Sequence, residues 1–320
     1  MTGFPLTRRF AQHTIAALAL LCLLPLHAAF AWSATGHMIA ATIAYRSLSP
    51  ELRTSYITLL AAHPEYGDWM RSYEGNVDEG AYLFMRASVW PDELKKNRGN
   101  PETHAEWHYL NMPLIAPSFP PRDAPKPGPK GDIIVAIELN RRVLASGSAS
   151  PTQRAVALAW LLHLVGDLHQ PLHTTALIND VYKAPKGDKG GNDFFIRPSE
   201  RAKKPISLHS FWDGLLGTSK NLRSAYNEAL ELEREHTRST LPELQAAASV
   251  RDWMLESRAI AIDSVYLDGR LAGVDDKSLD APIVPETYRR SSKSVAGRRV
   301  ALAGYRLADL LRRGPVAGAD

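Results

Sequence analysis

The stretch AWLLHLVGDLHQPLH, residues 159–173, places a histidine and an aspartate inside an otherwise apolar helical pattern. His163 and Asp167 stand four positions apart, so on a helix both side chains project from the same face. An imidazole and a carboxylate that converge in this way are ligands that zinc accepts. The same spacing is also typical of an ordinary buried hydrogen bond, so this pair alone leaves both interpretations open.

A second pair with the same spacing follows at His209 and Asp213, and His173 adds a further imidazole. Burying several titratable groups without a compensating ion costs on the order of several kcal/mol for each group. Two such pairs in apolar surroundings therefore favour a metal site over purely structural pairing.

Apolar residues recur at helical spacing through most of the chain, and Ser49-Pro50-Glu51 is typical of a helix start. No run of alternating β-branched residues appears between the helical patterns. Helices are predicted over 36–60, 133–144, 151–166, 222–235 and 249–267.

We therefore predict a mainly α-helical single domain, residues 32–311, with long irregular loops at 117–130 and 181–204. Residues 312–320 are expected to be a frayed tail. Trp160 and Trp253 are interpreted as core residues. The pairs Arg289-Arg290 and Arg298-Arg299 are interpreted as solvated.

Residues 1–31 are typical of a signal peptide for export. Arg8 and Arg9 precede an apolar run, and Ala29-Phe30-Ala31 has the small-residue spacing of a signal peptidase site. The alternative is an uncleaved membrane anchor, but a spanning helix needs roughly 20 apolar residues and this run is interrupted by Pro25. We expect cleavage after Ala31 and delivery to the periplasm or the medium.

The remaining 289 of the 320 residues are nearly neutral, because removing two arginines from 38 basic residues leaves 36 against 34 acids. This balance gives no broad basic surface, so a polyanion must be attracted locally, for instance by metal. Cys22, inside the signal, is the only cysteine, which excludes an intramolecular disulfide. No Asn-x-Ser/Thr acceptor follows residue 31, which favours bacterial export.

Several motifs, taken together and in order, resemble the S1/P1 nuclease family across most of the mature chain. They are Trp32, Gly36-His37, Trp90-Pro91-Asp92, Trp107-His108, the stretch from His163 to His173, Gly190-Gly191-Asn192, and the stretch from His209 to Asp213. The resemblance implies an exported endonuclease that hydrolyses single-stranded RNA and DNA to 5′-phosphorylated products. It leaves open a 3′-nucleotidase activity.

The resemblance also implies three zinc ions. It assigns the first ion to Asp92, His108, His163 and Asp167, the second to His173, His209 and Asp213, and the third to His37, Asp167 and the amine and carbonyl of Trp32. Asp167 would then bridge two ions. The Trp32 amine exists only after signal cleavage, so export would complete the site.

Four further residues match family positions that act on the substrate. Lys95, three residues after Asp92, matches a basic residue that neutralises charge on phosphorus, and with Asp92 and Asp167 it forms the expected catalytic set. Substrate binding is expected from Tyr109, Asn111 and Asn192. Tyr109 would stack a base, and Asn111 would read its edge where the fungal enzymes carry an acid.

Two other functions remain open from the sequence. One is a zinc phospholipase C, which shares the fold and also acts on a phosphodiester. The other is a non-catalytic exported zinc-binding protein. The expected partners are single-stranded nucleic acid and nucleotides, with no protein partner implied and no stable membrane association after signal cleavage.

Overall fold

The computed structural model of the protein describes residues 32–94, 100, 102–115, 132–246, 249–277 and 280–314. The predicted signal peptide 1–31, Lys95, the predicted loop 117–130 and residues 315–320 of the predicted tail lie outside this range.

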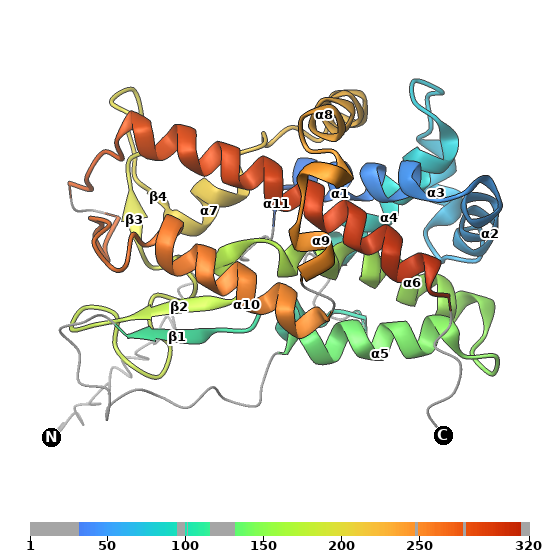
Figure 1. The fold of residues 1–320 in the computed structure, drawn as a ribbon, viewed down its shortest axis with the longest axis horizontal. Coiled ribbons are helices and arrows are strands. Elements are labelled where there is room, and N and C mark those ends of the chain that lie inside the picture. The colour runs from blue at the N-terminus through green and yellow to red at the C-terminus, as the bar shows by residue number, and fades with distance from the viewer. Residues whose placement is uncertain are drawn as a thin grey trace, which may run out of the picture.

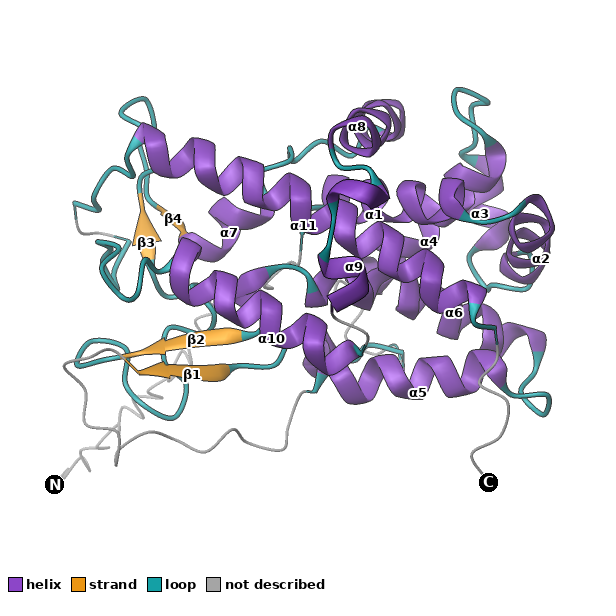
Figure 2. Ribbon diagram, viewed as in Figure 1, coloured by secondary structure: helices purple, strands orange, loops and turns teal. Residues whose placement is uncertain are grey.

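Helices dominate the described residues, as predicted (Figures 1 and 2). The α-helices are α1 (Ala34–Ser47), α2 (Pro50–Leu60), α3 (Tyr66–Arg71), α4 (Glu79–Leu94), α5 (Ile133–Ala145), α6 (Pro151–Leu168), α7 (Leu208–Asp213), α8 (Leu222–Glu235), α9 (Glu243–Ala246), α10 (Val250–Ile260) and α11 (Glu286–Arg312). Shorter turns are η1 (Ala105–His108), η3 (Pro171–His173), η4 (Arg238–Thr240) and the π-helical η5 (Ala261–Val265). Within this part of the chain, none of the helices has the length and apolar character that crossing a membrane requires.

The centre of the bundle is formed by α1 and α6. Every residue from Thr35 to Tyr45 in α1 is buried, and so is the C-terminal half of α6. Helices that are apolar on all sides are typical of a protein core. α6 packs against α1, α4, α5 and α11, and Figure 1 shows α11 lying across α1 and α6. The helix that carries His163 and Asp167 is therefore enclosed by its neighbours.

Local sequence signals explain where the predicted helices begin. Pro50 and Pro151 occupy the first helical positions of α2 and α6, where a missing N–H costs nothing. Before α6, Ser150 and Gln153 form a capping box, since each side chain accepts a hydrogen bond from the other residue's backbone N–H. These helix starts agree with the predicted ones.

The structure also contains short strands that the sequence pattern does not predict. β1 (Met112–Ile115) pairs in parallel with β2 (Thr175–Ile178), and β3 (Phe195–Ile196) pairs antiparallel with β4 (Ile206–Ser207). Runs of two to four residues are too short for an alternating pattern to be recognised. The β1–β2 pairing places the segment after His108 directly beside the segment after His173.

The predicted helices omit α11, which is the longest helix described. Its first half, ETYRRSSKSVAGRR, is rich in arginine and serine and lacks a clear apolar stripe. The interpretation of Arg299 as solvated is wrong, because the side chain is only 2% exposed and its Nη1 lies 3.0 Å from Glu256 Oε2. Trp160 and Trp253 are buried, as predicted.

Candidate metal centre

His163 and Asp167 lie on one face of α6 and are fully buried. His163 Nε2 is 3.1 Å from Asp167 Oδ2. The other ring nitrogen, Nδ1, donates a hydrogen bond of 2.8 Å to the backbone oxygen of Ser88 in α4. This bond fixes the proton on Nδ1 and leaves the lone pair of Nε2 for a cation.

The first cluster consists of Asp92, His108 and His163, all buried. α4 supplies Asp92 from its last turn, and η1 supplies His108. His108 Nδ1 lies 2.9 Å from His163 Nε2 and 3.9 Å from Asp92 Oδ1, and His163 Nε2 is 3.7 Å from the same oxygen. His108 Nδ1 also lies 2.9 Å from Asp167 Oδ2, so Asp167 adjoins this cluster.

The second cluster consists of His37, His163 and Asp167. His37 Nε2 is 3.3 Å from Asp167 Oδ1, and the His37 ring stacks on the His163 ring with centroids 4.0 Å apart. Gly166 makes this packing possible, since a Cβ at that position would lie 2.9 Å from His37 Nδ1. The two oxygens of Asp167 thus face different clusters.

The third cluster consists of His173, His209 and Asp213. His209 Nε2 is 3.6 Å from Asp213 Oδ2, and the rings of His173 and His209 lie 5.0 Å apart. His173 Nδ1 donates to the backbone oxygen of His108 at 2.5 Å, which connects this cluster to the first. Gln170 Nε2 donates to Asp213 Oδ1 at 2.7 Å, a supporting contact that the sequence analysis missed.

These separations fit zinc. Tetrahedral zinc with bonds of about 2.0–2.1 Å places neighbouring ligand atoms about 3.3 Å apart. His37 Nε2 and Asp167 Oδ1 are buried, face each other at 3.3 Å, and form no well-aligned hydrogen bond with any described residue. Buried polar atoms are nearly always satisfied, so a cation between these two atoms accounts for their position.

The protonation states of the clusters suit a cation as well. Burial alone would raise the pKa of Asp167, but the surrounding His163, His173 and His108 hold that pKa well below its usual range. Burial lowers the pKa of His37, and the neighbouring His163 lowers it further. An ionised carboxylate and a neutral imidazole are the forms that bind zinc.

Comparison with known proteins shows to which family a chain with these three clusters belongs. A family model described as S1/P1 Nuclease matches residues 32–314. The chain belongs to the S1/P1 nuclease family. Among its relatives are two proteins of Arabidopsis thaliana, Endonuclease 4 (26% identical, over 70% of this chain and 74% of the relative) and Endonuclease 2 (24% identical, over 88% and 90%). Nuclease S1 of Aspergillus oryzae is 25% identical over 87% of this chain and 90% of its own length.

Membership of the S1/P1 nuclease family establishes the chemistry. The chain is a phosphodiester hydrolase and a zinc-dependent nuclease for single-stranded nucleic acid. The predicted family, fold class and enzyme class are therefore confirmed. Among the residues that the structure describes, the three buried clusters are the groups of side chains that could hold the metal of an S1/P1 nuclease.

The residues expected to bind substrate lie next to these clusters. Tyr109 and Asn111 follow His108, and Leu110 between them donates a backbone hydrogen bond of 2.7 Å to His173. Asn111 Oδ1 is 3.5 Å from the position that a Cβ on Gly190 would occupy. The segment with Tyr109 and Asn111 therefore lies against the loop that ends at Asn192, whose Nδ2 donates to Lys189.

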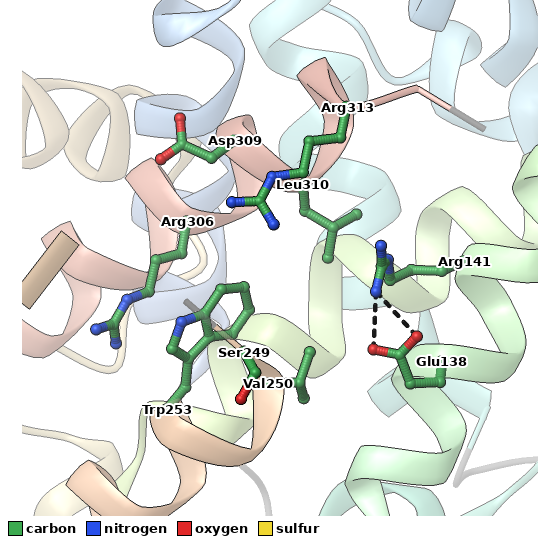
Figure 3. Close-up of a pocket in the computed structure, with 9 residues that line it drawn as sticks. All are labelled: Glu138, Arg141, Ser249, Val250, Trp253, Arg306, Asp309, Leu310 and Arg313. Atoms are coloured by element: carbon green, nitrogen blue, oxygen red, sulfur yellow. Dashed lines mark hydrogen bonds and ion pairs between the residues drawn. The ribbon is translucent and has the colours of Figure 1, made fainter. Parts of the chain in front are cut away.

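A small pocket elsewhere in the molecule is distinct from the clusters (Figure 3). It lies between α5, α10 and α11 and has a volume of about 150 Å³. Its walls contain none of the predicted site residues, and Arg141 within it is paired with Glu138 at 2.8 Å. Figure 3 shows these two side chains turned toward each other.

Proposed function

We propose that the enzyme holds three zinc ions and cleaves single-stranded RNA and DNA to products that carry 5′-phosphates. Asp92, His108, His163 and Asp167 hold the first ion, His173, His209 and Asp213 the second, and His37, Asp167 and the Trp32 amine and carbonyl the third. His173, His209 and Asp213 would give the second ion three protein ligands and would leave a position for water, as at catalytic zinc sites.

The position of Asp167 carries this proposal. Its Oδ2 is 2.9 Å from His108 Nδ1 and 3.1 Å from His163 Nε2, whereas its Oδ1 is 3.3 Å from His37 Nε2. A fully buried carboxylate with ligand atoms on both oxygens suits a bridge between two cations. A single structural His–Asp pair brings one imidazole to the carboxylate, whereas three imidazoles surround Asp167.

Zinc, when bound, supplies Lewis acidity that activates water and stabilises charge on the departing oxygen. The side chains of the protein position the substrate around it. In our proposal Tyr109 stacks a base, Asn111 reads the edge of that base, and Asn192 contacts a phosphate. Lys95, three residues beyond Asp92, neutralises charge that develops on the phosphoryl oxygens.

We propose that the chain is exported, that residues 1–31 are removed, and that 32–311 form the catalytic domain. Ala29-Phe30-Ala31 provides the cleavage signal. Trp32 is fully buried, and the backbone N–H of Ser33 donates to the backbone oxygen of Asp213 at 3.1 Å. These contacts support an amino terminus that is held at the metal centre, beside the proposed third ion, when the signal is cut.

Product analysis tests this function. The mature protein is incubated separately with single-stranded RNA, single-stranded DNA, a nucleoside 3′-phosphate and phosphatidylcholine vesicles, and the products are identified by mass spectrometry. We expect nucleotides with 5′-phosphates from both polymers and no diacylglycerol from the vesicles. The nucleoside 3′-phosphate shows whether a 3′-nucleotidase activity accompanies them. Products with 3′-phosphates would contradict the proposal, diacylglycerol would favour a phospholipase C, and no product would favour a zinc-binding protein.

A further inference from the structure

The loop KAPKGDKGGN, residues 183–192, is attached directly to one of the clusters. His209 Nδ1 donates a hydrogen bond of 2.6 Å to Gly190 O, and the backbone N–H of His209 donates to Gly191 O at 3.2 Å. Gly190 and Gly191 have φ values of 64° and 77°, which favour glycine. A Cβ at Gly190 would lie 2.5 Å from Leu172 O, so the loop backbone packs closely against the segment that precedes β2.

A buried carboxylate fixes the conformation of this loop. Asp188 is fully buried, and its Oδ1 accepts a hydrogen bond of 2.9 Å from the Leu177 N–H. Its Oδ2 accepts one of 2.6 Å from the hydroxyl of Tyr266. The Asp188 N–H donates in turn to Leu177 O at 3.0 Å. Asp188 thus anchors the loop to β2 and to the end of η5, and the loop returns along β2 toward His209.

The charges that this loop turns to solvent are mostly positive. Lys183, Lys186 and Lys189 are exposed, while the one acid between them, Asp188, points inward. Lys189 forms an ion pair of 2.7 Å with Asp193. Neither Lys183 nor Lys186 has an ion pair with any residue in the described ranges. On a chain with 38 basic and 34 acidic residues, two such lysines on the loop that leads to His209 form a local attraction for anions.

The loop extends away from the centre. Gly190 lies near Leu172 and Thr175, whereas Gly187 lies near Leu177 and Ile178. Because each strand residue advances about 3.3 Å, Gly187 lies about 7 to 10 Å farther along β2 than Gly190, and Lys186 directly precedes Gly187. Figure 1 shows the chain extending beyond the end of β2 before it returns to β3. Lys183 and Lys186 therefore lie beyond the segment that carries Asn192.

We propose that Lys183 and Lys186 bind backbone phosphates of the single strand beyond the bond that is cleaved, and that Asp188 holds the loop in place for this contact. This inference rests on the proposed function of the metal centre. The proposed contact distinguishes two classes of substrate, because a long strand reaches both lysines whereas a dinucleotide does not. The enzyme should therefore prefer polymers to dinucleotides.

The test compares the holoenzyme with Lys183→Ala/Lys186→Ala on a dinucleotide, thymidylyl-thymidine, and on a 20-mer of deoxythymidylate, at several salt concentrations. Each phosphate contact contributes about 0.7 to the salt dependence of single-strand binding, so the slope of log KM against log salt for the 20-mer should fall by about 1.4. At 0.1 M salt the ratio of kcat/KM for the 20-mer to kcat/KM for the dinucleotide should be about 20-fold smaller in the alanine variant than in wild type. Arg142→Ala/Arg234→Ala removes two exposed charges from α5 and α8 and serves as the control, with the wild-type slope and preference.

Variants that keep or reverse the charge test whether the effect of the alanine variant comes from lost charge or from a changed loop conformation. Lys183→Arg/Lys186→Arg should keep the wild-type preference, and Lys183→Glu/Lys186→Glu should weaken it more than alanine does. An unchanged salt slope in the alanine variant, or an arginine variant as weak as the alanine variant, overturns the proposal. If wild type cleaves neither substrate, the proposed function has failed instead, so the two failures are distinguishable.

Discussion

His37 Nε2 lies 3.3 Å from Asp167 Oδ1, and both side chains are fully buried. His37 belongs to the first turn of α1, five positions after Trp32, whereas Asp167 lies in the last turn of α6. The contact therefore ties the beginning of α1 to the helix that carries the centre. In the proposed assignment, the same ion also binds the amine of Trp32.

The first prediction concerns the amino terminus. A form with one additional residue before Trp32 has an amide in place of the amine, and an amide nitrogen has its lone pair delocalised into the peptide bond. We expect this form to bind about one zinc ion fewer per chain and to turn over more slowly. Elemental analysis and kcat measure the effect, and mass spectrometry of the exported chain should find Trp32 first. Equal zinc content and equal kcat in the two forms would remove the amine from the site.

The second prediction concerns base stacking by Tyr109. Tyr109→Ala should weaken substrate binding by about 1 to 3 kcal/mol, because an aromatic ring stacks on any base with that energy. The zinc content should not change, since the side chain is no proposed ligand. Titration with a single-stranded oligonucleotide and elemental analysis give both quantities, and wild-type affinity in the variant speaks against stacking.

The third prediction is a pH dependence of stability from Asp188. Burial raises the pKa of Asp188 to about 6, against hydrogen bonds from Tyr266, Gly191 and Leu177, whereas its ordinary value is 3.8. Because the folded state binds this proton more tightly, the group stabilises the fold below its unfolded pKa, and the contribution is lost as the pH rises through about 6. Relative to Asp188→Asn, the free energy of unfolding of wild type should fall by about 3 kcal/mol between about pH 3 and pH 7.

Urea denaturation of both proteins across this pH range measures the difference. The metal ligands titrate in both proteins, so their contribution cancels in the comparison. A difference that stays constant with pH would show that Asp188 has the same pKa in the folded and unfolded states.

The fourth prediction concerns a buried ionic cluster behind the centre. Glu256 accepts hydrogen bonds from Arg299 at 3.0 Å and from Arg306 at 2.7 and 2.8 Å, and both arginines are 2% exposed. Arg306 also donates to His169 Nε2 at 2.9 Å, at the end of α6. Glu256→Gln removes the carboxylate that contacts both buried cations and should cost about 3 to 5 kcal/mol of the free energy of unfolding.

The matched control is Glu138→Gln, which breaks the more exposed pair with Arg141 in Figure 3. Exposed pairs contribute about 0 to 1 kcal/mol, so this variant should unfold near the wild-type urea concentration. A loss of similar size in both variants would mean that burial does not strengthen the Glu256 cluster.

The sequence predicts the parts of the fold that depend on local signals. Pro50, Pro151 and the serines before them mark helix starts, and the spacing of His163 and Asp167 predicts their common face. The strands escape prediction because β3 and β4 have two residues each and form through contacts between distant segments. Helix α11 is not predicted because Arg299 and Arg306 interrupt its apolar pattern. These arginines are buried through pairing with Glu256, and no local sequence pattern indicates that pairing.

For the candidate centre, too, some features could be predicted from the sequence and others could not. The ligand types can be read from His37, Asp92, His108 and the two His-x-x-x-Asp pairs once the family resemblance is recognised. The supporting contacts cannot be read, because Ser88 and Gly190 act through backbone oxygens, which carry no sequence signal. The role of Asp188 depends on Tyr266, which lies far along the chain.

The zinc content of Asp167→Asn, measured by elemental analysis beside the mature wild-type protein, tests the central claim most directly. An amide cannot bridge two cations as a carboxylate does, because only its oxygen has a free lone pair. We predict about three zinc ions per chain in wild type and about one in the variant, retained by His173, His209 and Asp213. The same zinc content in both proteins would contradict the proposed bridge, and with it the three-ion centre.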